Sequence, residues 1–350
     1  GVIRPLGPTL LQVPAVPADV AFLESFSSAM FAGRGTHGWG GSWAGDAYHV
    51  LLYARLQPEI VYEETIMKWG LEGYRVLVLA DCDVLPAPVV ERIAAFQQSG
   101  GVIVGDARLC PAIRPDVLLE VYERTKQAAA DKEALLARAR LLREQLGPRY
   151  QPYVDSSLEE ALPYRRSYGS SDYVFVINDR REFGTYVGRH GLVMENGLPA
   201  SAQFTVNRKA GFVYDLVEHR PVSVESDGSV LRIPVDLEPG GGRLWLITEK
   251  AVGGVHIQAP AEAVRGEDLP VSITVADDAG APLNAVVPLE VVIRDPDGRR
   301  AEFSGYYGAR DGLLTLTITP APNDVPGMWT LEARELASGI VTRHYFRLPA

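Results

Sequence analysis

The feature that most constrains the fold of this chain is a strand, helix and strand pattern over residues 74–106. The apolar run VLVLA at 76–80 is followed by an amphipathic helical pattern at 88–98, by two glycines, and by a second apolar run, VIVG, at 102–105. Short continuous apolar runs are typical of strands that a parallel sheet buries on both faces. The pattern predicts an open α/β sheet, in which ligands and reactive groups lie just beyond the carboxyl ends of the strands.

Segments on either side extend this α/β pattern. We expect a first strand at 19–24, a helix at 46–56 and another strand at 59–62, and such alternation predicts βαβ units. Between 116 and 146 the chain has no Gly or Pro and is dense in Ala, Leu, Glu, Lys and Arg. That composition predicts one continuous helix of roughly 45 Å, which must pack on something beyond its own sheet.

The rest of the chain has the period of two that is typical of antiparallel strands. Residues 152–250 combine apolar alternation with Gly-rich turns, which predicts a β-sandwich. Residues 251–350 repeat this pattern with hairpin-type turns, and about seven strands in such a segment predict an immunoglobulin-like sandwich. The predicted fold class is therefore multidomain, with an α/β domain at 1–151 followed by two β-sandwiches.

The turn after the second apolar run carries Asp106 and Arg108, which are candidate ligand-binding residues together with Glu24 at the end of the first strand. An enzyme with a cysteine nucleophile at this turn needs a thiolate there, activated by a nearby histidine. Cys110 lies about four positions too late, and Cys82 follows the other strand. The two cysteines are expected as buried thiols or, alternatively, as a disulfide.

The loop at 33–43 is rich in glycine and contains His37, Trp39 and Trp43. Sugar rings stack on exposed aromatic faces, and glycine lets the backbone approach a ligand closely. Tryptophan is also enriched at interfaces between domains or subunits. Both interpretations stay open, so these three residues are candidates for ligand binding or for an interface.

Other patterns argue against several kinds of site. Glu63 and Glu64 are adjacent, so we expect solvated or helix-start carboxylates and not an acid and base pair. The six histidines include no pair four residues apart, and the cysteine spacing fits no metal site, so no metal or cofactor is expected. A net charge of −10 without a basic cluster argues against nucleic acid and anionic membranes as partners. No apolar stretch reaches the roughly 18 residues that membrane insertion needs.

The segments VLVLADCDVL at 76–85, ERIAAFQQSGG at 91–101 and VIV at 102–104 resemble the trimerisation domain of family 42 β-galactosidases. That domain has a class I glutamine-amidotransferase-like, flavodoxin-like fold without the cysteine nucleophile. The small β-domain that follows it in the family is similar to FVYDL at 212–216 and VDLEPGGGRL at 235–244. DPDG at 295–298 and NDVPGMW at 323–329 resemble macroglobulin-type, immunoglobulin-like repeats of bacterial surface proteins.

The resemblance implies a non-catalytic accessory and oligomerisation region of a multidomain bacterial glycoside-hydrolase-like protein. The family carries its catalytic carboxylates in a barrel of about 250 residues, and nothing before residue 18 encodes one. The expected partners are an upstream catalytic domain or a neighbouring subunit, and carbohydrate. The start without Met favours the interior of a larger protein, and the location expected is extracellular, periplasmic or at the cell surface.

Two alternatives stay open. One is a stand-alone carbohydrate-binding protein with Trp39 and Trp43 as its stacking surface. The other is a hydrolase in which Asp106, Glu24 and His37 assemble at the strand ends.

Overall fold

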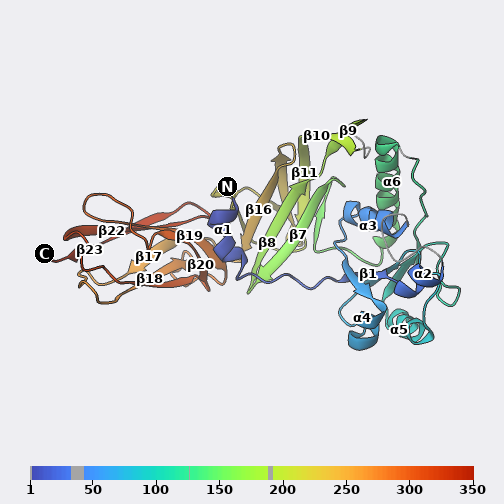
Figure 1. The fold of residues 1–350 in the computed structure, drawn as a ribbon, viewed down its shortest axis with the longest axis horizontal. Helices are drawn as coiled ribbons and strands as arrows, with labels where there is room; N and C mark the ends of the chain where they lie inside the picture. The colour runs from blue at the N-terminus through green and yellow to red at the C-terminus, as the bar shows by residue number, and fades with distance from the viewer. Residues whose placement is uncertain (1, 33–42, 126, 188–191) are drawn as a thin grey trace.

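The computed structural model contains three layered units that follow one another along the long axis of the molecule (Figure 1). The structure describes residues 2–32, 43–125, 127–187 and 192–350. The α/β unit lies at one end, a β-sandwich lies in the middle, and a seven-stranded unit lies at the other end (Figure 1). Within the described ranges, no helix combines the length and the apolar character needed to cross a bilayer.

The α/β unit has a five-stranded parallel sheet in the order β2-β1-β3-β4-β5. The strands are β1 (Val20–Glu24), β2 (Glu59–Tyr62), β3 (Val76–Leu79), β4 (Val102–Gly105) and β5 (Val117–Leu118). This is the strand order of doubly wound sheets of the flavodoxin type. The parallel sheet predicted from the apolar runs is confirmed.

Helices cover both faces of this sheet (Figure 1). They are α2 (Phe26–Phe31), α3 (Trp43–Tyr53), α4 (Glu63–Trp69), α5 (Ala87–Gln98) and α6 (Ala128–Leu146). Alternate residues of each strand enter opposite cores, since Val78 packs in the core that contains α3 and α6, whereas Leu77 packs in the core that contains α4 and α5. A strand that is apolar on both faces therefore reads as an unbroken apolar run.

The long helix is shorter than predicted, and its expected start at 116 is wrong. Residues 117–118 form strand β5, because the Asp116 carboxylate accepts a hydrogen bond from the Ile103 amide at 2.8 Å and guides the chain along β4. Helix α6 begins at Ala128 and ends at Leu146. It does pack beyond its own sheet, because Lys132 donates a hydrogen bond to the Arg181 carbonyl of the middle unit at 3.0 Å.

The middle unit is a sandwich of a four-stranded sheet, β14-β15-β11-β6, and a five-stranded sheet, β13-β12-β16-β8-β7, with an added hairpin of β9 and β10. Its strands are β6 (Val154–Ser156), β7 (Ala161–Tyr168), β8 (Ser171–Asn178), β9 (Arg181–Val187), β10 (Leu192–Gly197), β11 (Ala200–Val206), β12 (Phe212–Asp215), β13 (Arg220–Val222), β14 (Glu225–Ser226), β15 (Leu231–Leu237) and β16 (Gly242–Thr248). Between the sheets, Phe204 packs edge-on against Trp245 with ring centroids 5.4 Å apart.

The C-terminal unit contains seven antiparallel strands, the number expected from the sequence. The strands are β17 (Gly254–Gln258), β18 (Leu269–Ala276), β19 (Val286–Arg294), β20 (Gly305–Arg310), β21 (Leu313–Ile318), β22 (Gly327–Glu335) and β23 (Val341–Leu348). Their order is β17-β18-β21-β20-β19-β22-β23, and contacts of β17 with β22 and β23 fold the sheet back on itself. Trp329 stacks on Phe346 in the enclosed core.

The first helix, α1 (Ile3–Leu10), which the sequence analysis did not predict, lies outside the α/β unit, although residues 1–151 are predicted as one domain. It packs on β19 and β20 of the C-terminal unit (Figure 1), and Leu6 is 1% exposed in the core that both β units share. The Gln12 amide donates a hydrogen bond to the Gly308 carbonyl at 3.1 Å. The chain then pairs at Ala15 with Arg166 of β7 before it enters β1.

Candidate functional site

The carboxyl edge of the parallel sheet holds a buried network around Asp106. This residue is 2% exposed, and both of its carboxylate oxygens are engaged: Oδ2 accepts from the Asp81 amide at 2.7 Å, and Oδ1 accepts from the Arg108 amide at 2.8 Å. Burial raises the pKa of Asp106, although the two amide donors and the Arg108 charge oppose that shift. Asp106 therefore connects the end of β4 to the turn after β3.

Asp81 is the partner that the sequence analysis missed. Its φ of 54° lies in the left-handed region, which Asp adopts more readily than most other residues. Arg108 donates to Asp81 Oδ1 at 2.9 Å, and its second terminal nitrogen lies 3.7 Å from Glu123 Oε1. Asp81 and the predicted residues Asp106 and Arg108 thus belong to one network of charges.

The neighbouring Cys82 does not supply a nucleophile to this edge. Cys82 is fully buried, and burial, followed by the negative charge of Asp106, raises the pKa of its thiol well above its ordinary value. A thiol in such surroundings stays protonated and inert. Cys82 and Cys110 are both free, so the alternative of a disulfide between them does not hold in this structure.

A second buried network lies beside the first and is centred on Glu63. The Glu63 side chain accepts hydrogen bonds from the Ser25 hydroxyl at 2.6 Å, the Ser27 hydroxyl at 2.8 Å and the Ser27 amide at 3.2 Å. Glu63 is the first residue of α4, so the expected position at a helix start is correct. The Glu63 side chain is buried and not solvated, whereas Glu64 is exposed. These bonds join the starts of α2 and α4.

Among the described residues, Glu24 and Trp43 form no hydrogen bond with Asp106. Glu24 forms a hydrogen bond with the Tyr62 side chain. The negative charge of Glu24 and this hydrogen bond raise the pKa of the Tyr62 hydroxyl. Trp43 is 4% exposed and belongs to the core that contains the leucines of α6, so its indole offers no open face for a sugar. His37 and Trp39 lie outside the described residues.

Seven large apolar side chains of α2, β2 and α4 are exposed. Phe26 and Phe31 of α2 are 59% and 79% exposed, and Trp69 at the end of α4 is 70% exposed. The other members of this α2–α4 surface are Met30, Ile60, Tyr62 and Met67. Ile60 and Tyr62 belong to β2, which is the edge strand of the sheet.

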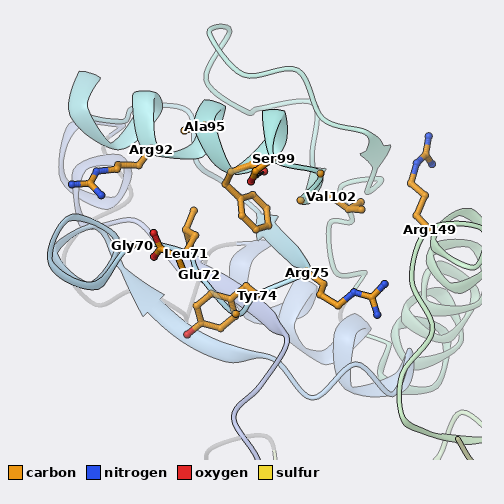
Figure 2. Close-up of a pocket in the computed structure, with 14 residues that line it drawn as sticks. Gly70, Leu71, Glu72, Tyr74, Arg75, Arg92, Ala95, Ser99, Val102 and Arg149 are labelled. Carbon is orange, nitrogen blue, oxygen red and sulfur yellow. Dashed lines mark hydrogen bonds between the residues drawn. The ribbon is translucent and has the colours of Figure 1, made fainter.

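Among the described residues, two of the cavities adjoin the α/β unit. One, of about 470 Å³, lies where this unit meets the middle sandwich, and Arg55 on its wall donates a hydrogen bond from Nε to Asp155 Oδ1 of the sandwich at 2.5 Å. Within the α/β unit, the Tyr150 hydroxyl donates to Asp19 at 2.8 Å on the same wall. The other, of about 680 Å³, is lined by the turns that precede β3 and β4 (Figure 2). It lies at the amino edge of the sheet, opposite Asp106.

The described residues contain no group of three or more His, Cys, Asp and Glu side chains arranged to hold a metal ion.

No protein-family model matches this chain, and no curated protein matches it. Among solved structures, it is similar to α-L-fucosidase isoenzyme 2 from Paenibacillus thiaminolyticus, at 14% identity over 69% of this chain and 50% of that one, with a TM-score of 0.47. It is also similar to the β-galactosidase of Bacillus circulans sp. alkalophilus, at 13% identity over 69% and 43% of the two chains, with a TM-score of 0.42.

A cold-adapted β-galactosidase from Rahnella sp. R3 is similar at 16% identity over 66% of this chain and 41% of that one, with a TM-score of 0.36. The chain therefore spans half or less of the length of each of these three proteins.

Proposed function

We propose that this chain is a non-catalytic accessory and oligomerisation region of a multidomain glycoside-hydrolase-like protein. The observation that carries the proposal is the use of Asp106. At the turn where an amidotransferase would hold its thiolate, Asp106 is buried and accepts hydrogen bonds from two backbone amides. A carboxylate with both oxygens engaged in this way is a structural connection and not a free nucleophile or base.

The proposal includes an amidotransferase-like α/β domain and an immunoglobulin-like third domain. The strand order β2-β1-β3-β4-β5 supports the first assignment, and seven antiparallel strands around one core support the second. The buried, protonated thiol of Cys82 is consistent with a scaffold that does no thiol chemistry.

Oligomerisation is supported by the α2–α4 surface. Exposed apolar patches mark interaction sites in soluble proteins, and α2, β2 and α4 supply seven exposed large apolar side chains. The surface continues onto the edge strand β2, which presents backbone groups that another chain can pair with. We assign a second copy of this chain as the occupant, since an unpaired edge strand can pair with the same strand of another copy.

The proposal is tested by measuring the mass of the chain in solution by analytical ultracentrifugation. We expect an oligomer that Phe31→Asp and Trp69→Asp dissociate. Met328→Asp is the matched control, because Met328 is 55% exposed on β22 and far from this surface in the sequence. A wild-type chain that stays monomeric at every concentration contradicts oligomerisation.

The non-catalytic part is tested separately with a panel of aryl glycosides. Release of aglycone by the purified chain, lost on Asp106→Asn, would establish a hydrolase and overturn this part of the proposal.

A further inference from the structure

The cavity at the amino edge of the sheet is lined by three arginines, Arg75, Arg92 and Arg149 (Figure 2). Arg75 directly precedes β3, Arg92 belongs to α5, and Arg149 follows α6. Three separate segments thus bring positive side chains to one hollow of a protein whose net charge is −10.

These arginines differ from most others in the α/β unit by having no ion pair. Among the described arginines from β1 to the end of this unit, six form salt bridges with carboxylates: Arg55, Arg108, Arg124, Arg138, Arg140 and Arg143. Salt bridges are absent from the described contacts of Arg75, Arg92, Arg149 and Arg114. Three of these four line the cavity, so positive charge without a carboxylate partner collects there, although the Arg75 guanidinium also lies 5.4 Å from the Tyr150 ring centroid.

The arginines are spread along the cavity and do not converge on one point. In Figure 2, Arg92 lies at one end of the lining and Arg149 at the other, with Tyr74 and Arg75 between them. A single small anion cannot contact all three guanidinium groups in such an arrangement. An extended molecule with several negative groups can, because each group meets one arginine and the weak exposed pairs add up.

The centre of the cavity offers a ring surface and a close backbone. The Tyr74 hydroxyl donates to Glu59 Oε2 at 2.9 Å, which fixes the ring in the lining. Gly73 and Gly100, both with positive φ, have no atom within 4 Å of where a Cβ would lie, so a ligand meets bare backbone there. Aromatic rings and open backbone suit the faces of sugar rings.

One lining residue, Glu72, carries the opposite charge. Its carboxylate lies close to Gly70, since a Cβ on that glycine would lie 2.0 Å from Glu72 Oε2. The lining therefore has three positive side chains and one negative side chain, and Glu72 opposes an anionic ligand.

From these observations we infer that the amino-edge cavity binds an extended acidic saccharide, whose carboxylate or sulfate groups pair with Arg92, Arg75 and Arg149. The requirement for several negative charges rests on the arginines. The choice of a saccharide as their carrier rests on the proposed function.

The test measures binding of the full chain by isothermal titration calorimetry to four probes. These are a uronic acid oligosaccharide, a sulfated galactan oligosaccharide, a neutral galactan oligosaccharide of equal length, and inorganic polyphosphate. We expect binding of at least one acidic saccharide, weaker binding of the neutral one, and loss of affinity when NaCl is raised from about 0.05 M to 0.5 M.

The variants separate this site from general charge effects. Arg75→Gln, Arg92→Gln and Arg149→Gln are each expected to weaken binding about two- to fivefold, as for exposed ion pairs, and Glu72→Gln is expected to tighten it about twofold. Arg114→Gln is the matched control, because it removes the same charge from an exposed, unpaired arginine that does not line the cavity. An unchanged melting temperature verifies that each variant folds.

The inference is overturned if neither acidic saccharide binds, if the neutral one binds equally well, or if Arg114→Gln weakens binding as much as the other substitutions. Tighter binding of polyphosphate than of both acidic saccharides overturns the choice of a saccharide. A chain that oligomerises and does not hydrolyse glycosides, yet binds no acidic saccharide, overturns this inference and leaves the proposed function intact.

Discussion

The backbone amide of Asp81 donates a hydrogen bond to Oδ2 of Asp106 at 2.7 Å and thereby joins the ends of two neighbouring parallel strands. In open α/β sheets this is the edge where ligands usually bind. Here the same edge is occupied by interactions within the protein, and Arg108 completes them by pairing with Asp81. The open cavity lined by arginines lies at the opposite edge.

We predict that Asp106→Asn destabilises the chain by about 1–3 kcal/mol. The two amides approach different carboxylate oxygens, so the amide nitrogen of Asn leaves one buried N–H without an acceptor. Urea unfolding of the variant measures the loss. Asp297→Asn, at an exposed turn of the C-terminal unit, is the control and is expected to change little.

The same substitution changes the pH dependence of stability. Burial raises the pKa of Asp106 above its ordinary value of 3.8, so the folded state holds this proton more tightly than the unfolded state does. The contribution of the protonated Asp106 side chain to the free energy of unfolding is therefore fully present below about pH 4. This contribution is lost as the pH rises through the raised pKa. The stability difference between wild type and Asp106→Asn should be largest in acid and smaller at neutral pH. A difference that grows with pH contradicts this.

Thiol labelling should distinguish the two cysteines. Cys82 is 0% exposed with a raised pKa, whereas Cys110 is partly exposed. We expect a thiol reagent to modify Cys110 in the native chain and Cys82 only after unfolding, because the thiolate is the reacting form. Cys110→Ser should abolish native labelling, and rapid labelling of that variant would show that Cys82 is accessible.

The contact between α6 and the middle sandwich depends on a buried ion pair, Lys132 with Glu160, whose side chains are 9% and 13% exposed. Lys132→Met is predicted to cost about 3 kcal/mol, since it leaves the Glu160 carboxylate buried without its cation. Adding Glu160→Leu should restore most of the loss, which a double-mutant cycle measures. Arg140→Met removes the more exposed ion pairs that Arg140 of α6 forms with Glu133 and Glu159. We expect it to lower the free energy of unfolding by less than about 1 kcal/mol.

The two β units meet at the Tyr173 hydroxyl, which donates to the Val286 carbonyl and accepts from the Val286 amide, each at 2.7 Å. Tyr173→Phe removes both bonds from a fully buried place, so we predict a loss of about 2 kcal/mol in chemical unfolding. Tyr345→Phe, at a hydroxyl of a 54% exposed residue, is the control. Equal effects of the two substitutions would contradict a specific role for Tyr173.

The sequence predicted those parts of the fold that depend on local patterns. The two apolar runs were placed correctly, because residues buried on both faces of a parallel sheet leave an unbroken apolar signature. The strand at 59–62 was also placed correctly, although it is an edge strand with only Val61 buried. The start of α6 was placed wrongly. Residues 117–118 belong to a segment whose composition suits a helix, but they pair with β4 in the sheet. Tertiary pairing outweighs helix propensity at this point.

The candidate site was predicted only in part, for a similar reason. Asp106 and Arg108 follow a strand end and could be identified from that position, whereas the link from Ser25 and Ser27 to Glu63 spans more than thirty residues and has no local pattern. Trp43 was expected near a glycine-rich surface loop, yet it begins α3 and its ring is buried. The arginine-lined cavity has no contiguous signature, because its arginines come from three separate segments.

Helix α1 has a consequence for how the molecule can be divided. Because its Leu6 lies in the core shared by the two β units, the first residues of the chain are held by the last hundred. A cut near residue 250 would therefore strip α1 of the surface that orders it, and the free segment would expose Leu6 to water. The second and third units are therefore separate in sequence but share one hydrophobic core. Helix α1, from the start of the described chain, packs into that core against the C-terminal unit.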